Sequence, residues 1–208
     1  SCLNVNAGKK ACLVSDQTYA LLQLALKLEK KLGRYFNIRF ASPTRAARFA
    51  KITLDATKRT AMLTHPQSKI GIGAIGKGYI LDDMISQSAF KQFPQVLINA
   101  GDLVAKGGPW NVEITYQTSS TREPLKTLSL SDRALATSGN DEQKGHIVDP
   151  VNGKAVERNA SVSVIGPQLA TADALATACY VMGKAKAQEL LEKNFPEYHM
   201  LWLNHDSQ

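Results

Sequence analysis

Asp173 and Thr177 form the pair whose residue types and spacing best suit chemistry in this chain. They lie within ATADALATACYVMG, residues 170–183, where Ala and Leu favour a helix that Thr171 could cap. On a helix, a spacing of four places the carboxylate and the hydroxyl on one face. Mg²⁺ takes few protein oxygens and accepts waters and phosphates, so the pair could hold it. Alternatively, Asp173 complements the helix dipole and Thr177 is a core hydroxyl.

A glycine-rich segment, GIGAIGKG at residues 71–78, suggests a site of a second kind. It is not a phosphate-binding P-loop, because Gly78 rather than Ser or Thr follows Lys77. Nor does an acidic residue follow it at the distance expected in a dinucleotide-binding unit. Glycines let the backbone approach a ligand, and the helix that begins here offers free N–H groups. The segment is therefore either an anion-binding turn or a plain connection between a strand and a helix.

His146 is the third candidate, in a loop with turn signals at Asp149-Pro150 and Asn152-Gly153. A histidine suits proton transfer near neutral pH, but a loop histidine is also an ordinary surface residue. The sequence contains no Gly-x-Ser-x-Gly elbow and no clustered His and Cys residues typical of a zinc site. Spacing alone does not single out Ser138 either.

Helices and strands must position these side chains. A leucine stripe predicts a helix over residues 15–32, with Ser15 as its N-cap and Gly33 at its end. Further helices are expected from about Lys77, in the Asp173 segment and over residues 184–193. The segment QVLINAGDLVAKG, residues 95–107, predicts a strand buried on both faces that runs into a glycine turn.

Other strands are expected where apolar residues alternate with polar ones, at NIRF (37–40), AKITLD (50–55), KRTAMLTH (58–65), WNVEITYQ (110–117), PLKTLSLS (124–131), RALATSG (133–139), NASVSVIG (159–166) and YHMLWLN (198–204). These strands form meanders and the helices gather at a few points. The order predicts an α+β fold with mixed or antiparallel sheets, as a single domain over residues 1–208.

Composition narrows the function. The net charge of +7 suits an anionic ligand or is simply a solvated basic surface. Basic residues form no dense block with aromatic residues between them, so nucleic-acid binding is not expected. No apolar run is long enough to span a membrane. Three cysteines argue against a disulfide framework; Cys179 fits a buried position, and Cys2 is either a lipid-bearing residue or an accident of where the chain begins.

In order, the segments GAIGKGYILD, LINAGDL, PWNVEI, ALATSG, HIVDPVNG, SVSVIGP and TADALATACYVMG resemble the FAD:protein FMN transferases, the ApbE-like family. The resemblance covers roughly residues 52–200. It implies an FAD-binding groove, a Mg²⁺ ion near the FAD pyrophosphate, and transfer of FMN to a Thr or Ser hydroxyl of a target flavoprotein with release of AMP. Some relatives instead hydrolyse FAD to FMN and AMP.

The resemblance also implies roles for residues. Metal ligands would be the side chains of Asp173 and Thr177 and the carbonyl of Gly76, with Asp173 and His146 as the catalytic residues. The residues expected to bind FAD are Gly76, Lys77, Tyr79, Asp82, Thr137, Ser138, Gly139 and Asp149. His146 would either accept the proton of the incoming hydroxyl or orient the phosphate.

The chain starts well inside the family pattern, so the first strands of relatives are absent, either in a fragment or in a naturally short member. Three functions follow: an Mg²⁺-dependent FMN transferase, a non-catalytic FAD-binding protein, or an FAD pyrophosphatase. The expected acceptor is a flavoprotein subunit of the redox-pump or electron-transfer type. The resemblance also implies the periplasmic side of the cell envelope, with membrane contact only through a possible lipid anchor.

Overall fold

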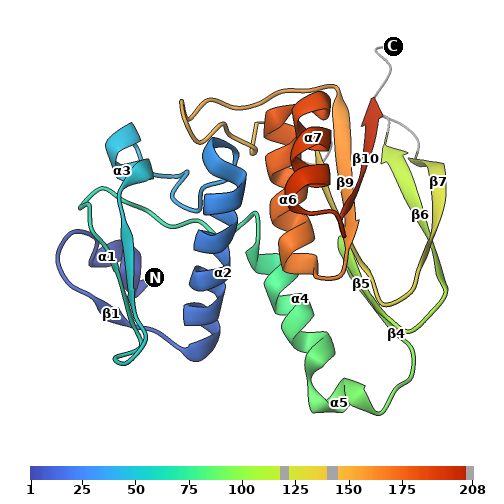
Figure 1. Ribbon diagram of the computed structural model, residues 1–208, viewed down its shortest axis with the longest axis horizontal. Coiled ribbons are helices and arrows are strands. Elements are labelled where there is room, and N and C mark those ends of the chain that lie inside the picture. Colours follow the sequence, from blue (N-terminus) through green and yellow to red (C-terminus); the bar gives the residue numbers. More distant parts are fainter. Residues whose placement is uncertain (118–121, 140–144, 205–208) are drawn as a thin grey trace.

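The computed structural model describes residues 1–117, 122–139 and 145–204, and shows helices and antiparallel sheets in separate layers (Figure 1). The helices are α1 (Cys2–Val5), α2 (Asp16–Leu32), the short 3₁₀ helix η1 (Gly33–Tyr35), α3 (Arg45–Phe49), α4 (Gly76–Ser86), α5 (Ser88–Lys91), α6 (Leu169–Met182) and α7 (Lys184–Asn194). The strands are β1 (Cys12–Leu13), β2 (Ile52–Asp55), β3 (Thr60–Leu63), β4 (Val96–Ala100), β5 (Asp102–Lys106), β6 (Trp110–Gln117), β7 (Arg122–Leu130), β8 (Ala134–Gly139), β9 (Ala160–Gly166) and β10 (His199–Asn204). The predicted α+β class is confirmed.

A five-stranded sheet in the order β10-β9-β8-β5-β4 carries most of the fold, and all its neighbouring strands are antiparallel. Its two faces are covered differently, because successive residues of a strand point to opposite sides. Ala134 and Ala136 of β8 join the core shared with α6, whereas Leu135 joins a second cluster with the β6–β7 hairpin. The sheet is therefore buried between a helix and a hairpin.

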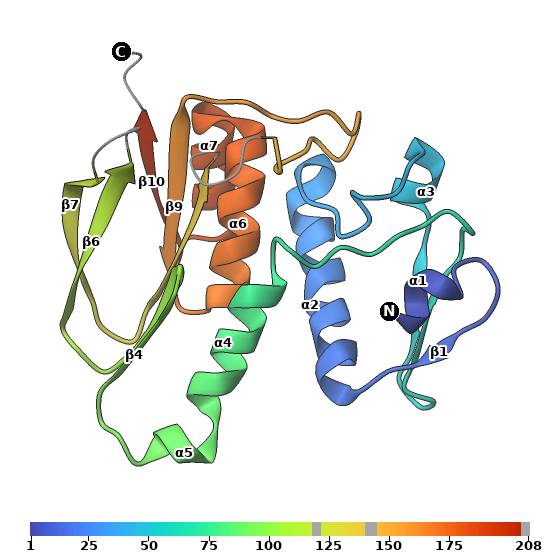
Figure 2. The same cartoon turned by 180° about the vertical axis from the view of Figure 1, so that it is seen from behind.

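Helix α6 lies between the sheet and α2, as both views show (Figures 1 and 2). Nearly all of its residues are buried, and Leu175 is fully enclosed. A helix that is apolar all round is expected at the centre of a core. Any polar side chain on α6, such as Asp173 or Thr177, is consequently held by a rigid and well-packed support.

The N-terminal layer consists of α1, α2, η1, α3 and a three-stranded sheet in the order β1-β3-β2. Helix α2 begins where the Ser15 hydroxyl accepts a hydrogen bond from the Thr18 amide at 3.2 Å. It ends at Gly33, whose φ of +59° is favourable only for glycine. The helix predicted over residues 15–32 is confirmed. Among the described residues, no helix has the length and apolar character needed to cross a bilayer.

The strand predicted for residues 37–40 is wrong. Asn37 accepts a hydrogen bond from the Arg39 amide through its side chain, at 2.7 Å, and one from the Phe40 amide through its carbonyl, at 3.1 Å. These local bonds fold the segment into a turn, because an Asn side chain competes with a neighbouring strand for backbone donors.

Two other expectations are corrected. Residues 95–107 form two strands, β4 and β5, joined at Gly101 with φ +89°, and the edge strand β4 is partly exposed while β5 is buried. The sequence LINAGDL conceals this hairpin because its apolar residues continue on both sides of the turn. Helix α6 begins at Leu169, so Thr171 lies in its first turn instead of capping it.

Candidate active site

One cavity of about 480 Å³ collects most of the predicted site residues. This volume is typical of a small-molecule site. Residues of η1 and the turn after it, the start of α4, the β4–β5 turn, β8, the loop before β9, and α6 line it. The predicted site residues among them are Lys77, Thr137, Ser138, Gly139, His146, Asp173 and Thr177.

Asp173 and Thr177 face the cavity from successive turns of α6, as their spacing predicts. A carboxylate oxygen of Asp173 accepts a 3.4 Å hydrogen bond from the Gly78 amide, in the first turn of α4. The Thr177 hydroxyl lies 3.1 Å from the Ser138 hydroxyl on β8. Two hydroxyls and a carboxylate from α6 and β8 therefore converge, beside an amide of α4.

Gly78 makes this convergence possible. A Cβ atom at this position would lie 2.6 Å from the Leu169 carbonyl oxygen, which is too close for any side chain. Glycine thus lets the N-terminal turn of α4 cross the start of α6 in direct backbone contact. The glycine-rich segment serves a close approach between helices, and this contact brings an amide of α4 to Asp173.

Asp102, which the sequence analysis missed, lies in the same cavity. It is 2% exposed, forms an ion pair with the Lys77 ammonium at 2.8 Å, and accepts a hydrogen bond from the Thr137 amide at 3.1 Å. The available signal was an acidic residue at the head of an apolar strand, directly after a glycine. A buried carboxylate is rare unless it is paired or functional.

Burial, together with the negative charge of neighbouring Asp102, raises the pKa of Asp173 to about 7. The Lys77 ammonium and the Gly78 amide oppose this shift. Asp102 and Asp173 thus share the positive charge of one lysine ammonium, and a bound cation would favour the ionised form of Asp173.

These donors fit a hard divalent cation. Mg²⁺ prefers oxygen ligands, takes one or two carboxylates and keeps positions for water and phosphate oxygens. Asp173, Thr177 and Ser138 offer only oxygens. Within the described ranges, no group of three or more His, Cys, Asp or Glu side chains is placed to hold a metal ion. Gly76, the first residue of α4, is buried and is not among the residues that line the cavity. The role of its carbonyl as a metal ligand stays a prediction.

Asp82 lies in α4 but is not among the residues that line the cavity, and its predicted contact with FAD stays a prediction. Its two carboxylate oxygens accept hydrogen bonds from the Leu169 and Ala170 amides, at 2.9 and 2.8 Å. These amides belong to the first turn of α6, where a carboxylate satisfies free N–H groups and the helix dipole. Burial raises the pKa of Asp82. The structure therefore assigns Asp82 to the start of α6.

Two more of the residues expected to contact FAD, Tyr79 and Asp149, are also outside the lining. Asp149 organises a turn by accepting a hydrogen bond from the Val151 amide at 2.8 Å, while its neighbours Val148 and Pro150 line the cavity. His146 lines the cavity with an exposed side chain. The predicted roles of His146, Tyr79 and Asp149 toward FAD remain predictions.

The chain is similar in sequence to known proteins. A protein of Treponema pallidum named FAD:protein FMN transferase is 28% identical over 97% of this chain and 69% of its own length. A Haemophilus influenzae protein of the same name is 30% identical over 69% of this chain and 47% of its own length. The chain therefore spans between about half and about two thirds of these relatives.

Solved structures share the fold. The apo form of the Pseudomonas stutzeri flavinyl transferase ApbE has a TM-score of 0.81 at 20% identity, over 100% of this chain and 74% of that one. The flavin transferase ApbE from Vibrio cholerae has a TM-score of 0.81 at 22% identity, over 98% of this chain and 76% of that one. A sequence model described as the ApbE family matches residues 1–202. The chain belongs to the ApbE family.

Proposed function

We propose that this chain is an FAD:protein FMN transferase, which binds FAD in the cavity and moves its FMN part to a Thr or Ser hydroxyl of an acceptor flavoprotein. The observation that carries the proposal is the convergence of Asp173, Thr177, Asp102 and Lys77 at one polar wall of the cavity. The names of the Treponema pallidum and Haemophilus influenzae relatives support the same reaction.

In this reaction the acceptor oxygen bonds to the phosphorus of the FMN part, and the bond from that phosphorus to the AMP oxygen breaks. AMP carries away the bonding electron pair, and the hydroxyl proton passes to a base. A bound Mg²⁺ would neutralise the pyrophosphate oxygens and align them. Asp173, Thr177 and Ser138 would hold that ion.

The chain's own residues supply the rest. The Lys77 ammonium, held at 2.8 Å by Asp102, presents a positive charge at the cavity to the anionic pyrophosphate. The aromatic residues Tyr35, Phe36 and Phe40 line the cavity and offer flat apolar surface for a ring system. His146, also in the lining, would accept the hydroxyl proton or orient the phosphate.

One incubation tests the proposal. The full chain is mixed with FAD, Mg²⁺ and a purified acceptor flavoprotein domain, and the acceptor's intact mass and free AMP are measured. We expect a covalent FMN adduct with an equal amount of AMP. AMP without an adduct would instead identify an FAD pyrophosphatase, and bound FAD without either product would identify a non-catalytic flavin-binding protein.

A matched pair of variants links the activity to the site. Asp173→Ala should abolish metal-dependent turnover, because the carboxylate proposed to bind the ion is lost. Asp83→Ala, which removes an exposed carboxylate on α4, should leave turnover unchanged. Activity that survives Asp173→Ala would refute the metal assignment.

We also propose that the protein works on the periplasmic side of the cell envelope, as the family resemblance implies. Cell fractionation with a cytoplasmic marker enzyme tests this. Recovery of the full-length protein with the cytoplasmic marker would contradict it.

A further inference from the structure

The cavity has two walls that come from distant parts of the sequence. One is the turn after η1, where Phe36, Asn37, Ile38 and Phe40 line the cavity. The other is the loop before β9, from which His146, Ile147, Val148 and Pro150 line it. Neither wall belongs to a helix or a strand of regular structure, apart from one isolated bridge between Val148 and Ala155. Backbone hydrogen bonds hold each wall locally, from the Gly71 amide to the Ile38 carbonyl and from the Val156 amide to the Ile147 carbonyl, each at 2.8 Å. Side chains add the bonds that connect these walls to the elements around them.

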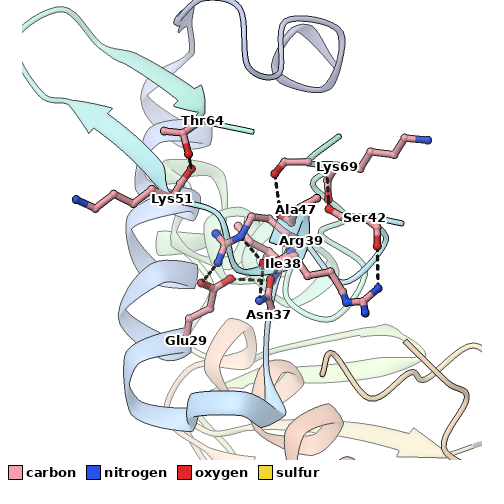
Figure 3. A network of polar contacts seen from close by, with 11 residues as sticks. Glu29, Asn37, Ile38, Arg39, Ser42, Ala47, Lys51, Thr64 and Lys69 are labelled. Carbon is pink, nitrogen blue, oxygen red and sulfur yellow. Dashed lines mark hydrogen bonds and ion pairs between the residues drawn. The ribbon is translucent and has the colours of Figure 1, made fainter. Parts of the chain in front are cut away.

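The first wall is fixed by a buried ion pair. Glu29 of α2 binds the Arg39 guanidinium at 2.7 Å with one carboxylate oxygen, and with the other it accepts a hydrogen bond from the Ile38 amide at 2.8 Å (Figure 3). Burial raises the pKa of Glu29, which Arg39 opposes. The turn is thereby held against α2.

Arg48 of α3 connects this wall to the other. Its carbonyl accepts hydrogen bonds from the Asn37 side-chain amide and from Arg39 Nε, each at 2.9 Å. Its guanidinium donates to the Ser42 carbonyl at 3.0 Å and, across the chain, to the Val151 carbonyl at 3.3 Å. One residue therefore contacts both walls, which agrees with the path of the segment before β9 toward α3 in both views (Figures 1 and 2).

The environment of Arg48 is unusual for an arginine. The residue is 8% exposed, its Nε has no hydrogen-bond partner, and within the described residues no carboxylate pairs with it. A buried charge without a counter-charge is costly, and an apolar side chain of similar volume is often as stable or more stable. The free energy of folding alone therefore does not favour an arginine at this position. Its two directed hydrogen bonds do fix where the Ser42 and Val151 carbonyls lie relative to each other.

We propose that Arg48 is a positioning residue that fixes the distance between the two walls of the FAD cavity. This inference rests on the proposed function for its ligand, FAD, but its geometry does not depend on that function. Arg48 does not line the cavity: its carbonyl accepts hydrogen bonds from the side chains of Asn37 and Arg39, and its guanidinium donates to the backbone carbonyls of Ser42 and Val151.

The test uses Arg48→Met, which keeps an unbranched apolar side chain and removes the charge and the donors. Its matched control is Arg45→Met on the same helix, where the guanidinium lies over the Phe49 ring at 5.6 Å. We expect Arg48→Met to raise the KM for FAD by about tenfold or more with much less change in kcat, since misplaced binding groups weaken productive contacts. Arg48→Lys, which retains a donor, should restore part of the loss, and Arg45→Met should match the parent.

Amide hydrogen exchange gives a readout that needs no FAD. In Arg48→Met, exchange should accelerate in residues 36–42 and 147–153 while β9 and α6 stay protected. If this variant fails to fold, Gly153→Ala serves instead, because a Cβ there would lie 3.0 Å from Arg48 Nη1 and the φ of +72° strains an alanine. It should accelerate exchange in both walls as well.

The outcomes separate the two ideas. A parent protein that binds no FAD would refute the proposed function, and exchange would still decide the role of Arg48. An unchanged KM for FAD in Arg48→Met, or faster exchange spread evenly over the molecule, would overturn the positioning role while leaving the transferase proposal intact.

Discussion

At the scale of single residues, the decisive feature is the crowding of charge around Asp173. Lys77 balances only one of the two carboxylates near it, and solvent reaches the Asp173 side chain poorly. Negative charge that is not balanced until a ligand binds is typical of functional sites, where it lowers the stability of the free protein and favours binding. Two variants test this account.

Asp173→Asn should stabilise the metal-free protein at pH 8. Folding raises the pKa of Asp173 from 3.8 to about 7, because the fold favours its neutral form. The contribution of this group to the free energy of unfolding is therefore fully present below about pH 4 and is lost as the pH rises through 7. Three pKa units correspond to about 4 kcal/mol, an upper limit for the gain. Urea unfolding at pH 8 and pH 4 measures it, and the gain should vanish at pH 4. An equal loss at both values would show that the hydrogen bonds of Asp173 outweigh its charge.

Asp102→Asn should move the acid limb of Mg²⁺ binding to lower pH. Asp102 is a source of the negative potential that raises the pKa of Asp173, so its removal eases ionisation of Asp173. The increase in melting temperature caused by Mg²⁺ is measured from pH 5 to pH 8. The exposed Asp83→Asn is the control, and identical pH midpoints for Asp102→Asn and the parent would contradict the coupling.

At the scale of elements, the start of α6 is held by α4. Asp82 supplies both oxygens to the first amides of α6, and Gly78 removes the side chain that would keep the helices apart. The orientation of α6, and with it the direction of Asp173 and Thr177, depends on these two residues of another helix.

Asp82→Ala should lower the free energy of unfolding by about 1–2 kcal/mol, the usual cost of losing a helix cap. Neighbouring Asp83→Ala should change it little, because that carboxylate is exposed. Urea unfolding measures both. If Asp82→Ala kept full stability but lost FAD binding, Asp82 would contact FAD, as the family resemblance implied.

At the scale of the whole molecule, the main core joins the three-stranded and the five-stranded sheets. The same cluster contains Leu63 of β3, Leu28 of α2 and Leu175 of α6, while a smaller cluster lies beneath the β6–β7 hairpin. A continuous core favours unfolding in one cooperative transition. The single domain expected over residues 1–208 stays a prediction.

Leu63→Ala should therefore lower the free energy of unfolding that is measured by the fluorescence of the distant tryptophans. Trp110 and Trp202 pack at the five-stranded sheet and its hairpin, whereas Leu63 is buried in the three-stranded sheet. Removing a buried leucine costs about 2–5 kcal/mol. Tryptophan fluorescence in urea should show one transition at lower urea. An unchanged fluorescence transition would instead indicate that the N-terminal layer unfolds separately.

The sequence by itself determined the features that depend on neighbours along the chain. Ser15 and Gly33 set the ends of α2, and the four-residue spacing of Asp173 and Thr177 set their common face. The order of the motifs identified the family, which the match over residues 1–202 confirms. Alternation failed at residues 37–40, where the side chain of Asn37 formed a turn instead of a strand.

Only the tertiary structure decided which distant groups meet. Asp102 reaches Lys77, Asp82 reaches α6 and Arg48 reaches Val151 across separations that no local pattern encodes. Burial and the field of neighbouring charges arise from packing, so the raised pKa of Asp173 could not be deduced from its sequence context. The chemistry of the site is thus carried by residue types, while its electrostatics and geometry are set by the fold.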